Sequence, residues 1–370
     1  MIRIEQDLRA AELNCSSESG VIRPPNSMKH SFSTLSSCVL FLLSISLLHA
    51  IGNCSPHYYR PSQFQNPKVV QTIFEKDFEI HKVVSSFTFT LPGSLTSGRF
   101  ATTSWVPSRH LQGLVFIAHG FGEYLSSSSY DRLSHRLASK GFLVFGHDHL
   151  GHGHSSGERV QVVGSFSTDY VFPVLEHCHK VRRDHPELPL FIIGHSMGSL
   201  VSLLAVLEDD TVPKLFSGAV LMAPFVQKTP EMESALNHAL TWGISKVLPS
   251  FQVGKIDLNH VTRDPKERKR LEKNPLNSTG VKAKQALAMV RALDYLKDRM
   301  NQVEIPILIQ QGQDDKVLVP GGAVRLYKGI ASKDKVLEIY PGGFHHLYID
   351  LPEVRDAAIQ DVVNWITMRS

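Results

Sequence analysis

The stretch "LPLFIIGHSMGSLVSLL", residues 188–204, decides the predicted fold. Apolar residues that suit a buried strand run into Gly194-His195-Ser196-Met197-Gly198, and a helical pattern follows. A strand that turns into a helix within two residues strains the backbone of the corner residue and leaves room only for small neighbours. Glycines stand two residues before and after Ser196, so we predict that this serine lies exposed at a sharp turn. The pattern also arises by chance, so its surroundings must decide.

Strand and helix signals alternate along the rest of the chain. An opening antiparallel pair is expected at "FTFTL" and "RFATTSWV", and six buried strands are expected at 114–120, 142–148, 189–195, 217–224, 306–312 and 336–343. This alternation predicts an α/β fold with a mostly parallel, eight-stranded sheet and helices on both faces. In such sheets, functional sites gather at the carboxyl ends of the strands.

The positions of these signals divide the chain into four parts. Residues 70–224 and 304–370 are expected to form the two parts of one core, and residues 225–303 an inserted helical cap over the site. Residues 1–52 read as an N-terminal extension that holds a signal peptide or signal anchor. Met28 is a possible internal start, and the apolar run that follows it, residues 38–48, precedes a possible cleavage site before Asn53. An uncleaved anchor stays open. We expect the protein to be membrane-associated, and to be in the secretory pathway or extracellular if the leader from Met28 is cleaved.

Composition excludes some classes of function. The net charge of +4 is small for a chain of 370 residues, and no basic patch is interleaved with aromatic residues, so we expect no nucleic-acid partner. Cys178 lies in an apolar helical face and is expected to be a buried free thiol. The cysteines therefore imply no disulfide framework.

An acid and a histidine follow two later strands, in the order that a serine nucleophile requires. Asp315 comes after the strand at 306–312, and His345 comes after the strand at 336–343. A serine hydroxyl attacks well only when an imidazole takes its proton and a carboxylate orients that imidazole. Asp314 and His346 are the adjacent rivals. We predict a Ser196, Asp315 and His345 triad.

A loop that suits an oxyanion hole follows the strand at 114–120. In His119-Gly120-Phe121-Gly122, the backbone N–H of Phe121 is expected to stabilise a developing oxyanion together with the N–H of Met197. Side-chain substitutions cannot remove these backbone donors. Phe121 and Met197 therefore contribute through the position of their N–H groups and not through their side chains.

Together, these motifs resemble the monoacylglycerol lipases, serine hydrolases of the α/β-hydrolase fold, from about residue 75 to 368. The resemblance implies cleavage of a monoacylglycerol ester through an acyl-enzyme on Ser196, with Asp315 as the orienting acid, His345 as the base and no cofactor. A lysophospholipase or a broader carboxylesterase is the alternative, and a non-catalytic binding protein on the same fold is a distant one. The motifs are "HGFGEY", "HDHLGHGHSSGER", "LPLFIIGHSMGS", "QGQDDK" and "YPGGFHHLYIDLPEV".

The resemblance also suggests two substrate contacts and marks departures from the family. Glu123 matches a family acid near the polar end of the pocket, and Tyr348 stands where the family often has a histidine. Ser199 replaces a second glycine after the nucleophile, and serines stand where an arginine near the glycerol group is expected. The head-group preference therefore depends on positions where this chain departs from the family.

A histidine-rich segment raises the alternative of a metal site. His147, His149, His152 and His154 lie close together, but the segment fits the turn common after this strand in such hydrolases, and no cysteine or carboxylate completes a convincing set of ligands. We predict no metal.

An apolar stripe in the cap bears on where the substrate comes from. Met232, Leu236, Leu240, Ile244 and Leu248 share one helical face, with Trp242 beside it. The stripe is either core between cap and sheet or a landing face for lipid. The charged run "KERKR" at 266–270 reads as a solvated turn that could also attract an anionic membrane. We expect a lipid ester substrate and a membrane surface as partners, and the sequence leaves the oligomeric state open.

Overall fold

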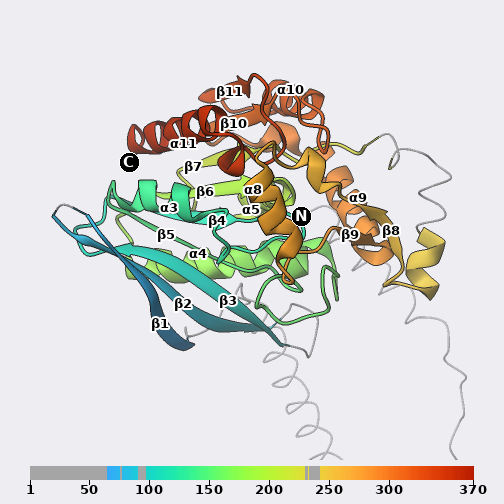
Figure 1. Cartoon of the computed structure of the whole chain (residues 1–370), viewed down its shortest axis with the longest axis horizontal. Coiled ribbons are helices and arrows are strands. Elements are labelled where there is room, and N and C mark those ends of the chain that lie inside the picture. The colour runs from blue at the N-terminus through green and yellow to red at the C-terminus, as the bar shows by residue number, and fades with distance from the viewer. Residues whose placement is uncertain (1–64, 76, 91–96, 230–231, 233–241) are drawn as a thin grey trace, which may run out of the picture. The chain divides into compact units, whose positions relative to one another are not determined.

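A computed structural model describes residues 65–75, 77–90, 97–229, 232 and 242–370 (Figure 1). The chain divides into two units, Met1–His57 and Tyr58–Ser370, and the fold described below belongs to the second. The predicted leader lies outside the described residues. Among the helices that are described, none is long and apolar enough to cross a membrane.

A mixed sheet forms the centre of this unit. Its strand order is β1-β2-β3-β5-β4-β6-β7-β10-β11, and every pair from β5 to β11 is parallel. The α/β fold with a mostly parallel sheet is therefore confirmed. The strands are β1 Gln65–Phe74, β2 Glu79–Thr90, β3 Ser97–Pro107, β4 Gly113–Ala118, β5 Phe142–His147, β6 Leu190–His195, β7 Gly218–Met222, β10 Ile307–Gly312 and β11 Lys335–Tyr340.

The prediction of eight strands is wrong by one, because β1 was missed. This strand pairs only with β2, is exposed over most of its length and has two register irregularities. An edge strand with one neighbour buries little surface, so its sequence need not alternate between apolar and polar residues. The expected opening pair, β2 and β3, is antiparallel as predicted.

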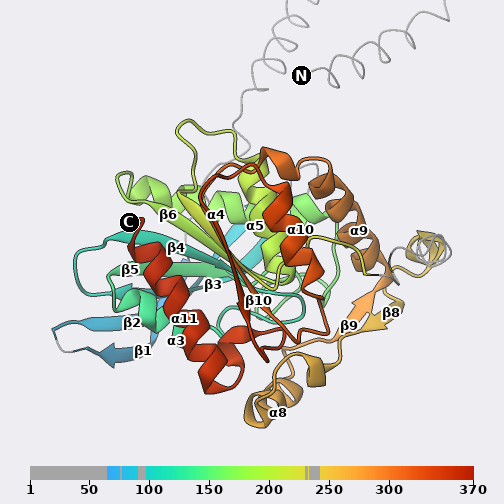
Figure 2. The same cartoon turned by 90° about the horizontal axis from the view of Figure 1, so that it is seen from above.

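Helices cover both faces of the sheet (Figure 2). Helices α4, α5, α9 and α10 contribute to one hydrophobic core, whereas α3 and α11 contribute to the other. The buried Cys178 is a free thiol on α4, as predicted. The helices are α3 Asp131–Ala138, α4 Phe172–Asp184 with the preceding π-helix η1 Ser167–Val171, α5 Met197–Glu208, α9 Ala283–Lys297, α10 Gly321–Gly329 and α11 Pro352–Thr367, and short 3-10 turns occur at η3 Met300–Gln302 and η4 Leu347–Ile349.

The segment between β7 and β10 contains a small two-stranded sheet and further helices. The described elements of this region are β8 Gln252–Lys255, η2 Leu258–His260, α8 Pro265–Lys273 and β9 Gly280–Lys282, followed by α9. The predicted turn at 266–270 is wrong, because these residues lie in α8. Asp264 caps the helix by accepting a hydrogen bond from the Lys266 N–H (2.8 Å), and Pro265 occupies the first helical position.

The predicted apolar stripe is only partly described. Met232 packs against the hydrophobic core that α4, α5, α9 and α10 share, while Leu248 is exposed. Leu236 and Leu240 lie outside the described residues. Among the described residues of this region, the exposed apolar side chains include Leu248 of the stripe and Trp242 beside it. The others are Val247, Phe251 and Val253.

Candidate active site

Ser196 lies at the corner between β6 and α5. Its backbone has φ 52° and ψ −117°, a left-handed conformation that is costly for a residue with a side chain. Ser196 is half-buried, whereas the residues on both sides of it are buried. The serine is therefore the point at which this strand–helix corner opens to solvent.

The glycines around Ser196 permit close packing of the backbone. A Cβ on Gly194 would lie 2.5 Å from the carbonyl oxygen of Gly198, and a Cβ on Gly198 would collide with the carbonyl oxygens of Ala118 and His119. Ser199, which departs from the family pattern, donates its hydroxyl to the Gly194 carbonyl at 2.8 Å. The corner thus tolerates a serine at this position.

Asp315 and His345 lie side by side after strands β10 and β11. The distance from His345 Nδ1 to Asp315 Oδ2 is 2.9 Å, and both residues are buried. Asp314 is exposed, and His346 lies instead beside Glu123, 3.3 Å away. The structure therefore brings together the pair predicted from the sequence, not its rivals.

The environment of Asp315 favours its ionised form. Its second oxygen accepts the backbone N–H groups of Val317 and Leu318 at 2.8 and 2.9 Å, and Gln311 donates to the first at 3.0 Å. Burial alone would raise the pKa of Asp315, but His345 and these donors outweigh it and hold the pKa below its usual value. An anionic Asp315 can hold the Nδ1–H tautomer of His345, which leaves Nε2 free to accept a proton.

The expected oxyanion loop follows β4 and is fixed by its first residue. His119 Nδ1 lies 2.8 Å from the Gly120 carbonyl oxygen, and its Nε2 accepts the backbone N–H of His149 at 2.9 Å. Burial lowers the pKa of His119 well below its usual value, so the ring is neutral and can play both roles. Phe121 follows in this loop, and Met197 is the first residue of α5.

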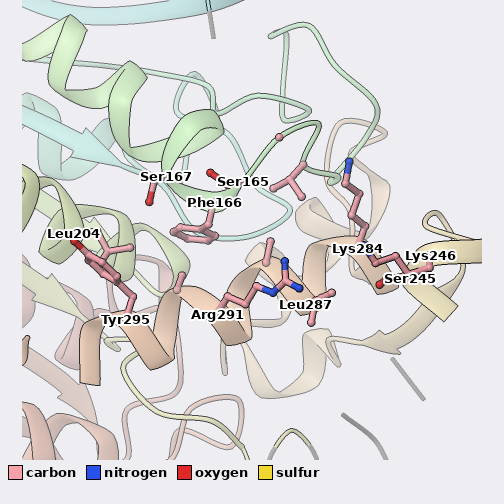
Figure 3. Close-up of a pocket in the computed structure, with 14 residues that line it drawn as sticks. Ser165, Phe166, Ser167, Leu204, Ser245, Lys246, Lys284, Leu287, Arg291 and Tyr295 are labelled. Carbon is pink, nitrogen blue, oxygen red and sulfur yellow. The ribbon is translucent and has the colours of Figure 1, made fainter. Parts of the chain in front are cut away.

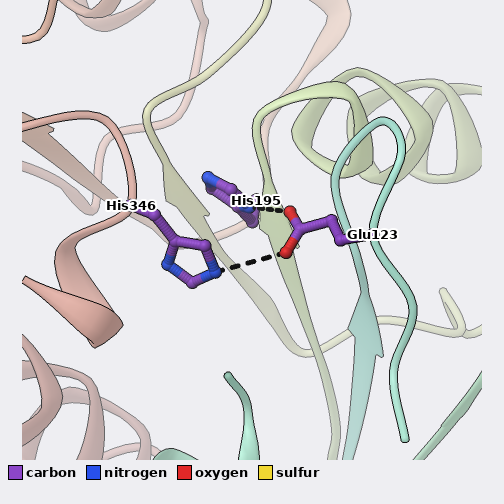
Figure 4. Close-up of side chains that lie close together, drawn as sticks. All are labelled: Glu123, His195 and His346. Atoms are coloured by element: carbon purple, nitrogen blue, oxygen red, sulfur yellow. Dashed lines mark hydrogen bonds and ion pairs between the residues drawn. The ribbon is translucent and has the colours of Figure 1, made fainter. Parts of the chain in front are cut away.

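Three side chains form a cluster next to these groups, and we call Glu123, His195 and His346 the Glu123 cluster (Figure 4). The Glu123 carboxylate is hydrogen-bonded to His195 Nδ1, and it accepts the Gly120 N–H at 3.0 Å. His346 Nε2 lies 3.3 Å from its other oxygen. The cluster therefore joins the oxyanion loop, the residue before Ser196 and the residue after His345.

The charges within the Glu123 cluster follow from its burial. Burial would raise the pKa of Glu123, but the two histidines outweigh it and lower the pKa well below the usual value. Burial, together with His346, lowers the pKa of His195 to about 4 despite Glu123. At neutral pH, an anionic Glu123 thus accepts a hydrogen bond from a neutral His195.

The donor atoms of the Glu123 cluster lie within 4.8 Å of one another, close enough to share a metal ion. Two histidines and a carboxylate are a common set of zinc ligands. Here, however, the carboxylate is already hydrogen-bonded within the protein, and an ion would have to displace those contacts. Within the described part of the chain, His147, His149, His152 and His154 do not form such a group.

Comparisons with known proteins show which family this chain belongs to. Residues 109–352 match the family model described as "Serine aminopeptidase, S33". The chain is 36% identical to the monoglyceride lipase of Mus musculus over 72% of this chain and 86% of the mouse protein, and 33% identical to the Homo sapiens enzyme over the same shares. The chain belongs to the monoglyceride lipase family.

A solved structure supports the fold of this family member. A soluble variant of the Saccharomyces cerevisiae monoglyceride lipase, in complex with a substrate analogue, superposes with a TM-score of 0.63 over 85% of this chain and 98% of the yeast chain. The identity is 21%, so this likeness supports the α/β-hydrolase fold alone.

Tyr348, one of the two predicted substrate contacts, lies in the core of this lipase-family chain. It is buried, and its hydroxyl donates to Gln310 Oε1 at 2.8 Å. Glu123, the other one, is bound by the protein's own donors. Substrate contact by either residue stays a prediction, and both have a clear structural partner.

Sequence reasoning missed the joint position of His195 and His346 around Glu123. The sequence did show both histidines beside predicted catalytic residues, since His195 directly precedes Ser196 and His346 directly follows His345. A sequence alone does not show that residues this far apart share one carboxylate.

Proposed function

We propose that this protein hydrolyses the ester bond of monoacylglycerols to a free fatty acid and glycerol. The observation that carries the proposal is the 2.9 Å contact between Asp315 and His345, in a fold that also holds the half-buried Ser196 at a strained turn. The relatives that bear the name monoglyceride lipase supply the substrate class.

The first half of the reaction acylates Ser196. His345 Nε2 takes the proton of the Ser196 hydroxyl as the oxygen attacks the ester carbonyl. The backbone N–H groups of Phe121 and Met197 stabilise the oxyanion that forms on the carbonyl oxygen. When this intermediate collapses, the glycerol oxygen leaves with the proton from His345, and the acyl group remains on Ser196.

The second half releases the acid. His345 takes a proton from a water molecule, and the resulting hydroxide attacks the acyl carbonyl through a second oxyanion. The bond to Ser196 then breaks, and His345 returns a proton to the serine. Throughout, Asp315 stays ionised and stabilises the imidazolium form of His345. The net reaction consumes one water and needs no cofactor.

A substrate panel tests this proposal against its alternatives. The purified protein is assayed with monoacylglycerols, lysophospholipids and short soluble esters that carry the same acyl chain where possible. We expect the highest kcat/KM for monoacylglycerols and no activity above background in Ser196→Ala. A preference for lysophospholipids, or equal rates on all esters, would replace the proposal with the corresponding alternative.

We also propose that the protein works on a membrane surface, because a monoacylglycerol partitions into bilayers. The cap region supports this with neighbouring exposed apolar side chains, among them Trp242 (51% exposed) and Leu248 (57% exposed). Lys246 and Lys255 lie in the same stretch and are exposed. Apolar area and positive charge together favour contact with anionic lipid. The leader expected after Met28 points in the same direction.

The charges of α8 that the sequence suggested for membrane contact are partly used within the protein. Arg270 is paired with Glu267 at 2.6 Å, and Arg268 lies 4.0 Å from Glu272. Lys266 and Lys269 are exposed. We therefore propose the stretch from Trp242 to Lys255 as the main contact and α8 as a minor one.

A further inference from the structure

A cavity of about 290 Å³ is lined by residues other than those proposed for catalysis (Figure 3). Helix α9 forms one wall of it, the loop at 162–167 forms another, and Leu204 of α5 and residues 245–246 of the cap complete it. The α9 side chains that face it recur at helical spacing, from Lys284 through Leu287 and Arg291 to Tyr295. The cavity shares none of its lining residues with the proposed active site.

The lining of this cavity is amphipathic. Its apolar part comes from Val162, Phe166, Leu204 and Leu287, together with two alanines of α9. Its charged part comes from Lys246, Lys284 and Arg291, with serine hydroxyls beside them. No residue of the described lining carries a carboxylate, so the charge of the lining is positive throughout.

The nearby acidic groups are already bound elsewhere. Asp169 is buried beneath the loop and accepts the N–H groups of Val163 (2.6 Å) and Gly164 (3.0 Å). Glu208 accepts the Tyr295 hydroxyl at 2.5 Å. Neither Lys246 nor Arg291 forms an ion pair with another described residue, and both are exposed. With respect to the part of the chain that the structure describes, both cations are therefore available to an anion.

The two cationic side chains that α9 contributes, Lys284 and Arg291, differ in what they can offer to a ligand. Lys284 already donates to the Val163 carbonyl at 2.5 Å, so its ammonium group is partly engaged within the protein. In Figure 3, the Arg291 side chain extends from α9 toward the loop that carries Ser165 and Phe166. A guanidinium in this position can hold a carboxylate with two parallel hydrogen bonds.

We propose that this cavity is a second lipid site, which binds the carboxylate of a long-chain fatty acid at Arg291 and Lys246 and its alkyl chain on the apolar wall. An amphipathic anion is the ligand class that matches both halves of the lining. The choice of a fatty acid rests on the proposed function, because that reaction releases one. The site would then sense product outside the catalytic centre.

Binding to protein with a blocked active site tests this proposal. The full chain is first labelled with a long-chain alkyl fluorophosphonate, whose alkyl group fills the catalytic acyl site, and labelling is verified by mass spectrometry. Calorimetry with myristate below its micellar concentration should then show one saturable site. Arg291→Gln with Lys246→Gln should weaken the binding about 10-fold or more. Lys297→Gln, an exposed change farther along α9, should leave it within about twofold.

Two comparisons complete the test. An alkanol and an alkyltrimethylammonium of the same chain length should bind at least about 10-fold more weakly than myristate, whereas Arg291→Lys should keep part of the affinity. Absence of saturable binding, equal affinity in the double variant, or equal affinity for the alkanol would overturn the proposal. Failure of the labelling step would count against the proposed function instead, and the variants would then be compared without the label.

Discussion

The carboxylate of Glu123 is hydrogen-bonded to the imidazole of His195, the residue that directly precedes the proposed nucleophile. Through the same carboxylate, the Gly120 N–H is held at 3.0 Å, one residue before the proposed oxyanion donor Phe121. Glu123 thus binds groups on both sides of the proposed reaction centre, and among the described residues it forms no hydrogen bond or ion pair with Ser196, Asp315 or His345. From this arrangement we predict that Glu123 acts as a positioning residue rather than a catalytic one.

Glu123→Gln should therefore lower kcat much more than it raises KM. A charge-assisted hydrogen bond contributes about 1.5–3 kcal/mol, which corresponds to a loss of roughly 10- to 150-fold. The loss should be similar for a monoacylglycerol and for a short ester without glycerol. Glu187→Gln, an exposed change, serves as the control. A higher KM for monoacylglycerols alone would instead show that Glu123 contacts the glycerol group.

Two substitutions of Ser196 separate catalysis from backbone strain. Ser196→Ala and Ser196→Gly should both abolish fluorophosphonate labelling and lower ester hydrolysis by about 10³-fold or more. Because φ is 52° here, glycine relieves strain that alanine retains, so the glycine variant should be more stable by about 1 kcal/mol. Urea unfolding of the two variants measures the difference. Labelling that persists in either variant would sink the assignment.

The acid and the base are tested against their immediate neighbours. Asp315→Asn and His345→Ala should each lower kcat by about 10³-fold or more, since the imidazole loses its orienting partner or is itself removed. Asp314→Asn should change little, because Asp314 is exposed. His346→Gln should have an intermediate effect through Glu123. Initial rates on one soluble ester rank the four variants, and a larger loss for Asp314→Asn than for Asp315→Asn would contradict the geometry.

The buried histidines predict loss of stability in acid. Burial lowers the pKa of His152 and His195 to about 4 and that of His177 to about 3. In the unfolded chain these groups have pKa values of about 6.5, so the unfolded state binds more protons and stability falls as pH decreases from about 6.5 to 4. Each such histidine contributes up to about 1.4 kcal/mol per pH unit. Urea midpoints measured from pH 7.5 to 4.5 should decline through this window, and a constant midpoint would disprove the argument.

The membrane proposal predicts a selective defect. Trp242→Glu with Leu248→Glu should weaken binding to vesicles that contain anionic lipid and slow the hydrolysis of long-chain monoacylglycerols in them. The rate on a short soluble ester should stay the same. Met368→Glu, an exposed apolar position outside the cap, is the matched control. If the double variant instead melts earlier and loses activity on every substrate, these side chains serve folding and not lipid contact.

The sequence predicted what depends on local pattern. The parallel strands, the strained serine and the spacing of Asp315 and His345 all follow from glycines, apolar runs and strand ends that can be read along the chain. Strand β1 was not predicted, because an exposed edge strand does not require an alternation of apolar and polar residues. Helix α8 was not predicted, because its many charged residues resemble those of a solvated turn. Its helix-start signals, Asp264 and Pro265, do indicate a helix.

The remaining parts of the site depend on distant contacts. Glu123 and His195 are 72 residues apart, and nothing local at either position indicates the other. The cavity beside α9 arises in the same way, since four separate segments line it. Only the packed structure brings such groups together.

The Glu123 cluster also has a consequence for how the protein folds. Its members follow β4, precede Ser196 at the end of β6 and follow β11, so the cluster closes only after the last strand has paired. Contacts of such long sequence separation form slowly, because much of the chain must be ordered first. During refolding, hydrolytic activity should therefore return after the helices, in step with the docking of β11. A ribosome-bound chain that lacks β11 would carry Ser196 but would be catalytically silent.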